Sequence, residues 1–310
     1  MAAALPPYGQ GRLFKTFPGC RQCLEGLART AAELAAGGDP GLLRRAREAG
    51  QRALAQSEGA PLSPPEVANR ILRAVRQETG ARDPYREFKA REQAAARQAA
   101  IQARELMGDS LESLVGLAAL GNSLDFFKAP AEAMAEVRAS LREGFSLHHN
   151  DTPRLERFLA AGRGLALYLT DNAGEIFFDL PLFRRLGRRL EKVVLVVKGG
   201  PALNDLTRDD LAAAGLLGEF AQVADTGVEG AGVEWPLVSE EFKALVEQAG
   251  LIVAKGMANF ESLYPLSLPS PVFHIFRVKC RPMRDYLHAP VNSHWALWRA
   301  AGGKRTEGHP

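Results

Sequence analysis

Residues 165–175, LALYLTDNAGE, place five apolar residues directly before a polar turn that contains glycine. A short, wholly apolar run predicts a strand buried on both faces, because a half-exposed strand would alternate apolar and polar side chains. Similar runs predict further strands at Val193–Val197, Ala221–Ala224, Leu251–Ala254 and Val272–Val278. Amphipathic helical stretches separate them, at Leu182–Leu190, Asp209–Ala214 and Ser239–Gln248. The second half of the chain therefore predicts a mainly parallel sheet with helices on both faces.

The first half of the chain has a different pattern. Ala, Leu, Arg and Glu dominate from Cys20 to about Glu143, with apolar residues at helical spacing. Ser63, two prolines and Glu66 predict a helix start, and Gly80 predicts its end. We expect an α/β fold class with two domains: a helical domain over residues 1–150, and a three-layer, Rossmann-like α/β/α domain over residues 151–310 that carries most of the metal and phosphate site.

Composition narrows the class of protein. The 310 residues are 46% hydrophobic and 24% charged, with a formal net charge of +3, which is too small to indicate nucleic acid as a partner. The longest apolar runs are far shorter than the roughly 20 residues that cross a bilayer, so no membrane partner is expected. Three cysteines and an N-terminus interrupted by Pro6, Pro7 and Gly9 predict a cytoplasmic protein. The sequence leaves the oligomeric state open.

Polar and glycine-rich residues follow each predicted strand. Ligands of open parallel sheets bind beyond the carboxyl ends of the strands, so these residues are candidates for one site. They include Asp171 and Asn172 after the first strand, Lys198 to Asp210 after the second, Gly227 after the third, Lys255 after the fourth and Lys279 after the fifth. Five such clusters at one edge are stronger support than any single motif.

The residue types favour phosphoryl transfer. Carboxylate and amide oxygens suit magnesium or manganese, so Asp171, Asn172 and Asp210 are candidate ligands of one divalent cation. Lysines such as Lys255 supply charge for phosphate, and glycine-rich turns expose backbone N–H groups to anions. A structural alternative stays open, because Asp-Asn-Ala-Gly also forms turns and caps helices, and Asp209 or Asp210 can cap the helix that begins there.

Three motifs carry a family resemblance. Thr-Asp-Asn-Ala-Gly-Glu (170–175), Asn-Asp-x-Thr-x-x-Asp (204–210) and Lys-Gly-x-x-Asn-Phe-Glu (255–261) resemble the damage-control phosphatase family, long filed as domain of unknown function 89 and also called acidic-residue-methyltransferase-1-like. Cys-x-x-Cys (20–23), Asp-Pro-Tyr (83–85) with Lys89, and Gly-Asn-Ser-Leu-Asp-Phe (121–126) resemble its stand-alone microbial branch. The resemblance covers roughly residues 18–291.

The resemblance implies a helical domain packed on a Rossmann-like domain, with the site in the cleft between them. It implies a metal-dependent phosphomonoesterase (a hydrolase) acting on a small phosphorylated metabolite, with one divalent cation (Mn, Mg, Ni or Co) held by Asp171, Asn172 and Asp210. It also implies that Lys255 contacts the substrate phosphate. Asp209 fits the acidic residue that usually precedes the metal aspartate, and the motif position five after Asp205 assigns the ligand to Asp210.

The complete prediction assigns a role to each candidate. The catalytic group is Asp171, Asn172, Lys255 and Glu175, where Glu175 or Asp179 would help orient water. Substrate or phosphate binding is assigned to Lys255, Asn259, Asn122, Asp205, Gly227 and Lys279. Asn122 either enters the cleft from the helical domain or caps a helix. Cys20 and Cys23 are either a partly buried structural pair, a metal or redox site, or a reversible disulfide.

Two other functions are considered. A protein carboxyl methyltransferase would need an adenosine pocket, and the chain has no GxGxG turn after a strand. A non-catalytic regulator that binds a phosphometabolite would not need a full set of metal ligands. The metal-dependent phosphatase is therefore the leading hypothesis.

Overall fold

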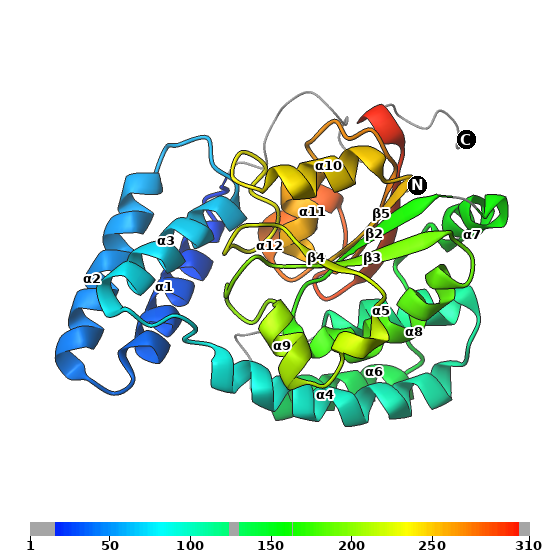
Figure 1. The fold of residues 1–310 in the computed structure, drawn as a ribbon. Coiled ribbons are helices and arrows are strands. Elements are labelled where there is room, and N and C mark those ends of the chain that lie inside the picture. Colours follow the sequence, from blue (N-terminus) through cyan, green and yellow to red (C-terminus); the bar gives the residue numbers. More distant parts are fainter. Residues whose placement is uncertain (1–15, 124–129, 163, 304–310) are drawn as a thin grey trace.

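One seven-stranded sheet forms the centre of the protein (Figure 1). The structure, a computed structural model, describes residues 16–123, 130–162 and 164–303. The strands are β1 (His149–Asn150), β2 (Leu165–Leu169), β3 (Lys192–Val197), β4 (Val223–Asp225), β5 (Leu251–Lys255), β6 (Val272–Arg277) and β7 (His294–Arg299). Their order is β1-β7-β6-β5-β2-β3-β4, and neighbours are parallel except β6 and β7. The mainly parallel α/β sheet is confirmed.

All five predicted strands are present. β2 has the predicted bounds, and β3, β5 and β6 differ by one residue at one end. β1 and β7 were not predicted, because β1 has two residues and β7 carries histidine and arginine at its ends instead of an apolar run. The predicted strand at Ala221–Ala224 lies two residues further along the chain, at Val223–Asp225.

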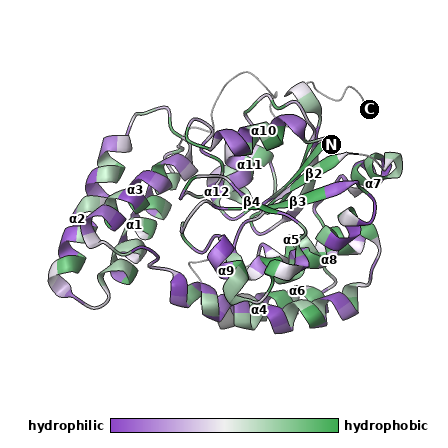
Figure 2. Ribbon diagram, viewed as in Figure 1, coloured by the Kyte–Doolittle hydropathy of each residue, from purple (hydrophilic) through white to green (hydrophobic). Residues whose placement is uncertain are grey.

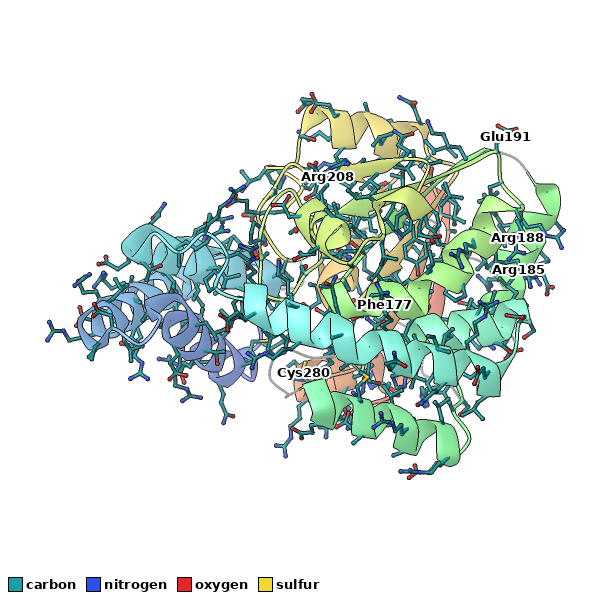
Figure 3. The ribbon with its side chains drawn as sticks, turned by 60° about the horizontal axis from the view of Figure 1, so that its bottom comes forward. Phe177, Arg185, Arg188, Glu191, Arg208 and Cys280 are labelled. Carbon is teal, nitrogen blue, oxygen red and sulfur yellow. The ribbon has the colours of Figure 1, made fainter. Side chains whose placement is uncertain are left out.

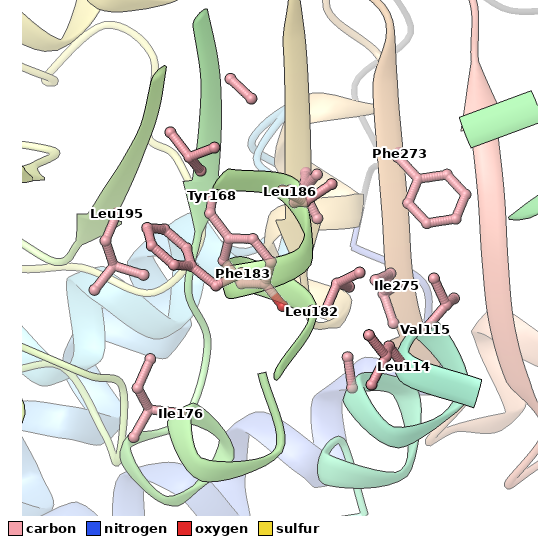
Figure 4. Close-up of a cluster of buried hydrophobic side chains, with 14 of the residues drawn as sticks. Leu114, Val115, Tyr168, Ile176, Leu182, Phe183, Leu186, Leu195, Phe273 and Ile275 are labelled. Atoms are coloured by element: carbon pink, nitrogen blue, oxygen red, sulfur yellow. The ribbon is translucent and has the colours of Figure 1, made fainter. Parts of the chain in front are cut away.

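The two faces of the sheet pack on different helices. Ala166 and Tyr168 of β2 join a core with α5 (Leu111–Gly121), α7 (Thr152–Ala161) and α8 (Ile176–Gly187), seen in Figure 4. Leu167 and Leu169 face the other way and pack with α10 (Glu240–Gln248). The alternation follows from the two-residue period of a strand, and it places apolar side chains on both faces of the central strands. In Figure 2 the ribbon of β2 has mainly the colour of hydrophobic residues. The three-layer arrangement is confirmed.

The helical half is divided between two cores. α1 (Cys20–Ala36), α2 (Pro40–Ser57) and α3 (Pro64–Thr79) form a lobe with its own core, at the left of Figure 1. α4 (Arg86–Met107), α5 and α6 (Pro130–Arg142) lie below the sheet, where α5 shares the core of the sheet. α3 begins after Ser63 and ends at Gly80 as predicted, and Ser63 and Glu66 form a capping box at its start. The domain limits at residue 150 remain a prediction.

Short elements follow the carboxyl ends of the strands. They are the 3-10 turn η1 (Ala173–Glu175) after β2, α9 (Arg208–Ala213) after β3, α11 (Met257–Leu263) after β5 and α12 (Arg281–Leu287) after β6. This edge faces the linker between α3 and α4, so the two halves of the chain meet there. Within the described residues, every helix is too short or too polar to cross a membrane.

Candidate active site at the carboxyl ends of the strands

Two loops are joined by their backbones at the centre of the site. Asn172 and Asp205 form an antiparallel bridge, although they are distant in sequence. The Leu206 N–H donates to the carbonyl of Asp171 at 2.8 Å, and the Ala173 N–H donates to the carbonyl of Asn204 at 2.8 Å. The turn after β2 and the loop after β3 therefore present Asp171, Asn172 and Asp205 together.

Asp171 lies in a crowded, buried environment. Burial, followed by the neighbouring Glu175 and Asp205 carboxylates, raises the pKa of Asp171 well above its usual range. The Asn122 amide nitrogen lies 3.4 Å from Asp171 Oδ2. The backbone of Gly256 passes so close that an added Cβ would overlap the Asp171 carboxylate, and the φ of +81° also favours glycine. The glycine of the Lys-Gly motif therefore leaves space for this carboxylate.

Glu175 is the centre of a buried hydrogen-bond network. Its Oε2 accepts from Asn122 Nδ2 at 2.6 Å and from Lys255 Nζ at 2.7 Å, and its Oε1 accepts from Asn172 Nδ2 at 2.8 Å. Donation by the amide nitrogen fixes the rotation of the Asn172 side chain, so its amide oxygen is turned away from Glu175. Glu175 thus orients both asparagines, and it is fully buried.

Lys255 is enclosed by two carboxylates. Its ammonium lies 2.7 Å from Glu175 Oε2 and 2.7 Å from Asp179 Oδ1, and its side chain is fully buried. Burial alone would lower the pKa of Lys255, but Asp179 and Glu175 together raise it above its ordinary value. Lys255 therefore stays protonated, and in this structure its partners are protein carboxylates. Asp179 is one helical turn after Glu175 on α8, so both carboxylates lie on the same face.

Lys198 lies beside Asp205. Its Nζ is 3.4 Å from Asp205 Oδ2 and 3.2 Å from the amide oxygen of Asn259. The amide nitrogen of Asn259 donates to the carbonyls of Thr170 and Lys255 at 3.0 and 2.7 Å. Asn259, predicted to bind substrate, therefore links the ends of β2 and β5 and positions Lys198. Burial raises the pKa of Asp205 to about 6, against the opposing charge of Lys198.

Glu92 of α4 holds both site loops and was not predicted. Its Oε1 accepts from the Gly174 N–H and its Oε2 from Asn204 Nδ2, both at 2.7 Å. Burial raises the pKa of Glu92 to about 8. No local motif marks this residue, because α4 reads as an ordinary amphipathic helix and only the tertiary fold brings Glu92 to the loops.

Asp210, predicted as a metal ligand, lies in a helix cap and an ion pair. Its Oδ2 lies 2.8 Å from Lys89 Nζ and accepts from the backbone N–H and hydroxyl of Thr207 at 2.9 and 2.6 Å. Thr207 and Asp210 form the capping box of α9, and Lys89 also pairs with Asp83 at 2.8 Å. This carboxylate is committed to a helix cap and an ion pair, whereas Asp205 is the acid that stands beside Asp171 and Asn172. Asp209 is exposed on α9.

Of the remaining predicted residues, some interact with this centre and others do not. Asn122 comes from the end of α5, so the helical half does contribute to the site. The charge of Lys279, half-buried after β6, lowers the pKa of Asp171 against the larger effects that raise it. Gly227 is exposed, and its N–H donates to the Asp225 carboxylate in a local turn. Residues 124–126 of the predicted 121–126 motif lie outside the described part of the chain.

The donor chemistry of the centre fits a hard divalent cation. Asp171 and Asp205 offer carboxylate oxygens beside the Asn172 amide, and the buried Oδ2 of Asp205 has only the Lys198 ammonium, at 3.4 Å, beside it among the described residues. A cation there would relieve the repulsion that raises the pKa of Asp171. Among residues 16–123, 130–162 and 164–303, no three His, Cys, Asp or Glu side chains converge as a metal centre. A site here would therefore depend on the amide ligand as well as the two acids.

Comparison with known proteins identifies relatives along nearly the whole chain. Residues 17–294 match the family described as "Damage-control phosphatase ARMT1-like domain". The chain is 33% identical over 277 residues to a protein of Archaeoglobus fulgidus named damage-control phosphatase, covering 87% of this chain and 94% of that protein. It is 30% identical over 275 residues to a damage-control phosphatase of Pyrococcus horikoshii, with 87% and 93% covered.

A solved structure supports the same relationship. The crystal structure of a DUF89 family protein from Pyrococcus horikoshii superimposes with a TM-score of 0.80 at 29% identity. The alignment covers 92% of this chain and 99% of that one. The similarity therefore extends over the helical half as well as the sheet.

Proposed function

The chain belongs to the damage-control phosphatase family with an ARMT1-like domain, and from this premise we propose that it is a divalent-metal-dependent phosphomonoesterase acting on a small phosphorylated metabolite. The observation that carries the proposal is the buried group of Asp171, Asn172 and Asp205, which lies beside Lys198 and Lys255. Two acids and an amide suit an oxygen-bound cation, and two ammonium groups suit phosphate.

The proposed metal ligands are Asp171, Asn172 and Asp205, with Asp205 in place of Asp210. Damage-control phosphatases are generally metal-dependent. When bound, a divalent cation (Mn, Mg, Ni or Co) would supply Lewis acidity toward phosphoryl oxygens and acidify water. Glu92 would hold the two loops together, because it contacts both of them through hydrogen bonds of 2.7 Å. The low cysteine content supports a cytoplasmic location.

Lys255 and Glu175 would work as an exchangeable pair. A phosphate that enters the site competes with Glu175 for the Lys255 ammonium. Asp179 remains beside Lys255 during this exchange, so the ammonium keeps one carboxylate at 2.7 Å. Glu175 Oε2, released from Lys255, can then accept a proton from the attacking water. Lys198 offsets negative charge on the phosphoryl oxygens from the side of Asp205.

The test is a phosphate-release screen against phosphometabolites with several divalent cations. We expect turnover that requires a cation, is lost in Asp205→Asn and persists in Asp209→Asn, an exposed acid nearby that serves as the matched control. Absence of turnover across the panel would favour the non-catalytic regulator. A rise in melting temperature with S-adenosylmethionine, without phosphate release, would favour the methyltransferase.

A further inference from the structure

A cavity lies at the opposite edge of the sheet from the candidate active site. It has a volume of about 900 Å³ and is bordered by the carboxyl end of α8, the first residues of β3 and the segment before β4. The active-site residues Glu175 and Asp179 lie at the amino end of α8. A helix of 12 residues is about 18 Å long, so the cavity is separated from the active site by the length of α8.

The cavity is lined by cations from three separate elements. They are Arg104 of α4, Arg184, Arg185 and Arg188 of α8 and Lys192 of β3. Figure 3 shows Arg185, Arg188 and Glu191 near one another at one end of the molecule. Cations are expected at a helix carboxyl end because of its dipole, which accounts for Arg104 in the last turn of α4 and for Arg184 and Arg185 in the last turn of α8, but not for Lys192.

Some of these cations form ion pairs or hydrogen bonds inside the cavity, and others have no acidic partner among the described residues. Arg104 pairs with the Asp109 carboxylate at 3.0 Å, and Arg185 donates to the Asp109 carbonyl at 2.6 Å. Arg184 pairs with Glu219. In the described part of the chain, Arg188 donates only to a backbone carbonyl and Lys192 has no acidic partner. Arg185, Arg188 and Lys192 therefore exceed the one remaining acid of the cavity, Glu191.

The cavity also has apolar walls. Pro181, Phe183 and Val193 line it beside the cations. Its volume lies within the range of roughly 300–1,000 Å³ that small-molecule sites occupy. Guanidinium groups bind phosphate in a bidentate manner, and an apolar wall suits a flat ring.

We propose that this cavity is a binding site for a nucleoside polyphosphate, separate from the active site. The phosphates contact Arg185, Arg188 and Lys192, and the base lies against Phe183 and Pro181. Bare phosphate could use the cations but not the apolar walls, so a nucleotide should bind more tightly than orthophosphate.

The experiment is calorimetric titration of the full chain with ADP in the presence of EDTA. The variants are Arg185→Gln/Arg188→Gln, the control Arg44→Gln/Arg157→Gln, which removes equal charge from exposed helix positions outside the cavity, and Asp205→Asn in the active site. Arg185 and Arg188 are not buried, so the cavity variant should fold, which its melting temperature verifies.

We expect saturable binding at one site that weakens by about tenfold or more in the cavity variant. Affinity should stay within about twofold in the control and in Asp205→Asn, and orthophosphate should bind more weakly than ADP. The proposal is overturned if millimolar ADP does not bind, if the control loses as much affinity as the cavity variant, or if only Asp205→Asn abolishes binding. Equal affinity for orthophosphate also overturns it, because the apolar walls would then contribute nothing.

Discussion

Lys89 and Lys255 are both fully buried lysines, and each lies between two carboxylates. The partners of Lys89 are Asp83, in the linker between α3 and α4, and Asp210, which caps α9. This group joins the two halves of the chain. The partners of Lys255 are Glu175 and Asp179, and Glu175 also receives hydrogen bonds from Asn122 and Asn172. This second group orients amides next to Asp171.

The comparison shows that residue types do not separate a structural ion pair from a catalytic one. Both groups hold one ammonium and two carboxylates, and both fall within motifs of the family resemblance. The difference is in what else each carboxylate binds. Oδ2 of Asp210 accepts hydrogen bonds from Thr207 and pairs with Lys89, and both partners are structural. The hydrogen bonds of Glu175, in contrast, include one from Asn172, a proposed metal ligand.

The largest expected effect separates the two lysine groups by activity. Lys255→Met/Asp179→Asn should lower kcat/KM by roughly thirty- to a thousandfold, because a charge-assisted contact is worth about 2–4 kcal/mol. Lys89→Met/Asp83→Asn removes the same pair of charges from the structural group, so its kcat/KM should change by less than about fivefold.

The measurement is steady-state kinetics on both variants, below both melting temperatures. Each variant leaves one buried carboxylate without its lysine and should lose on the order of 3 kcal/mol of unfolding free energy. Both variants should therefore lose stability to a similar degree, and only the change in kcat/KM should distinguish them. Equal losses of kcat/KM would show that the two groups do not differ in the way described.

A smaller effect is expected from Gly256→Ala. The added methyl would overlap the Asp171 carboxylate, and the φ of +81° disfavours alanine. Displacing a ligand from its orientation typically costs about ten- to a hundredfold in metal affinity or activity. Gly59→Ala, at a φ of +74° with open space around it, is the control for backbone strain alone. Normal metal affinity in Gly256→Ala would argue against Asp171 as a ligand.

The last effect is on stability and concerns Glu261, a buried carboxylate without a lysine in the described chain. Burial raises the pKa of Glu261 to about 8, from 4.5 for an exposed glutamate. The native state then holds a proton that the unfolded state has lost, so the contribution of Glu261 to stability falls as pH rises from about 4.5 to 8. Glu261→Gln should flatten the decrease of melting temperature between pH 5 and pH 8 by several degrees, because a shift of this size in the pKa corresponds to about 4 kcal/mol over that range. An unchanged slope would mean that Glu261 titrates normally.

The sequence predicted the elements that local patterns control. Five strands and the neighbourhood of Asp171, Asn172 and Glu175 follow from apolar runs and the residues directly after them, and the start of α3 follows from Ser63, two prolines and Glu66. The contact of Glu92 with Gly174 joins residues 82 apart in sequence, and the pairing of Lys89 with Asp210 joins residues 121 apart. Neither contact leaves a local pattern in the sequence.

A capping role for Asp210 was one of the alternatives that the sequence left open. Thr207 followed three residues later by an acid is a capping-box pattern, which predicts that the carboxylate folds back onto its own helix. That pattern favours Asp205 as the acid that remains available. Its position opposite Asn172 is set by a backbone bridge between two loops, and spacing alone does not predict such a bridge.

The most direct test of the account is the metal content of Asp205→Asn and Asp210→Asn, measured by elemental analysis together with manganese titration. Asp205 stands opposite Asn172, whereas Asp210 is bonded to Thr207 and Lys89. We predict that Asp205→Asn loses bound metal and turnover while keeping its fold, and that Asp210→Asn keeps its metal but melts at a lower temperature. Loss of metal from Asp210→Asn, with full occupancy in Asp205→Asn, would contradict the assignment of the site.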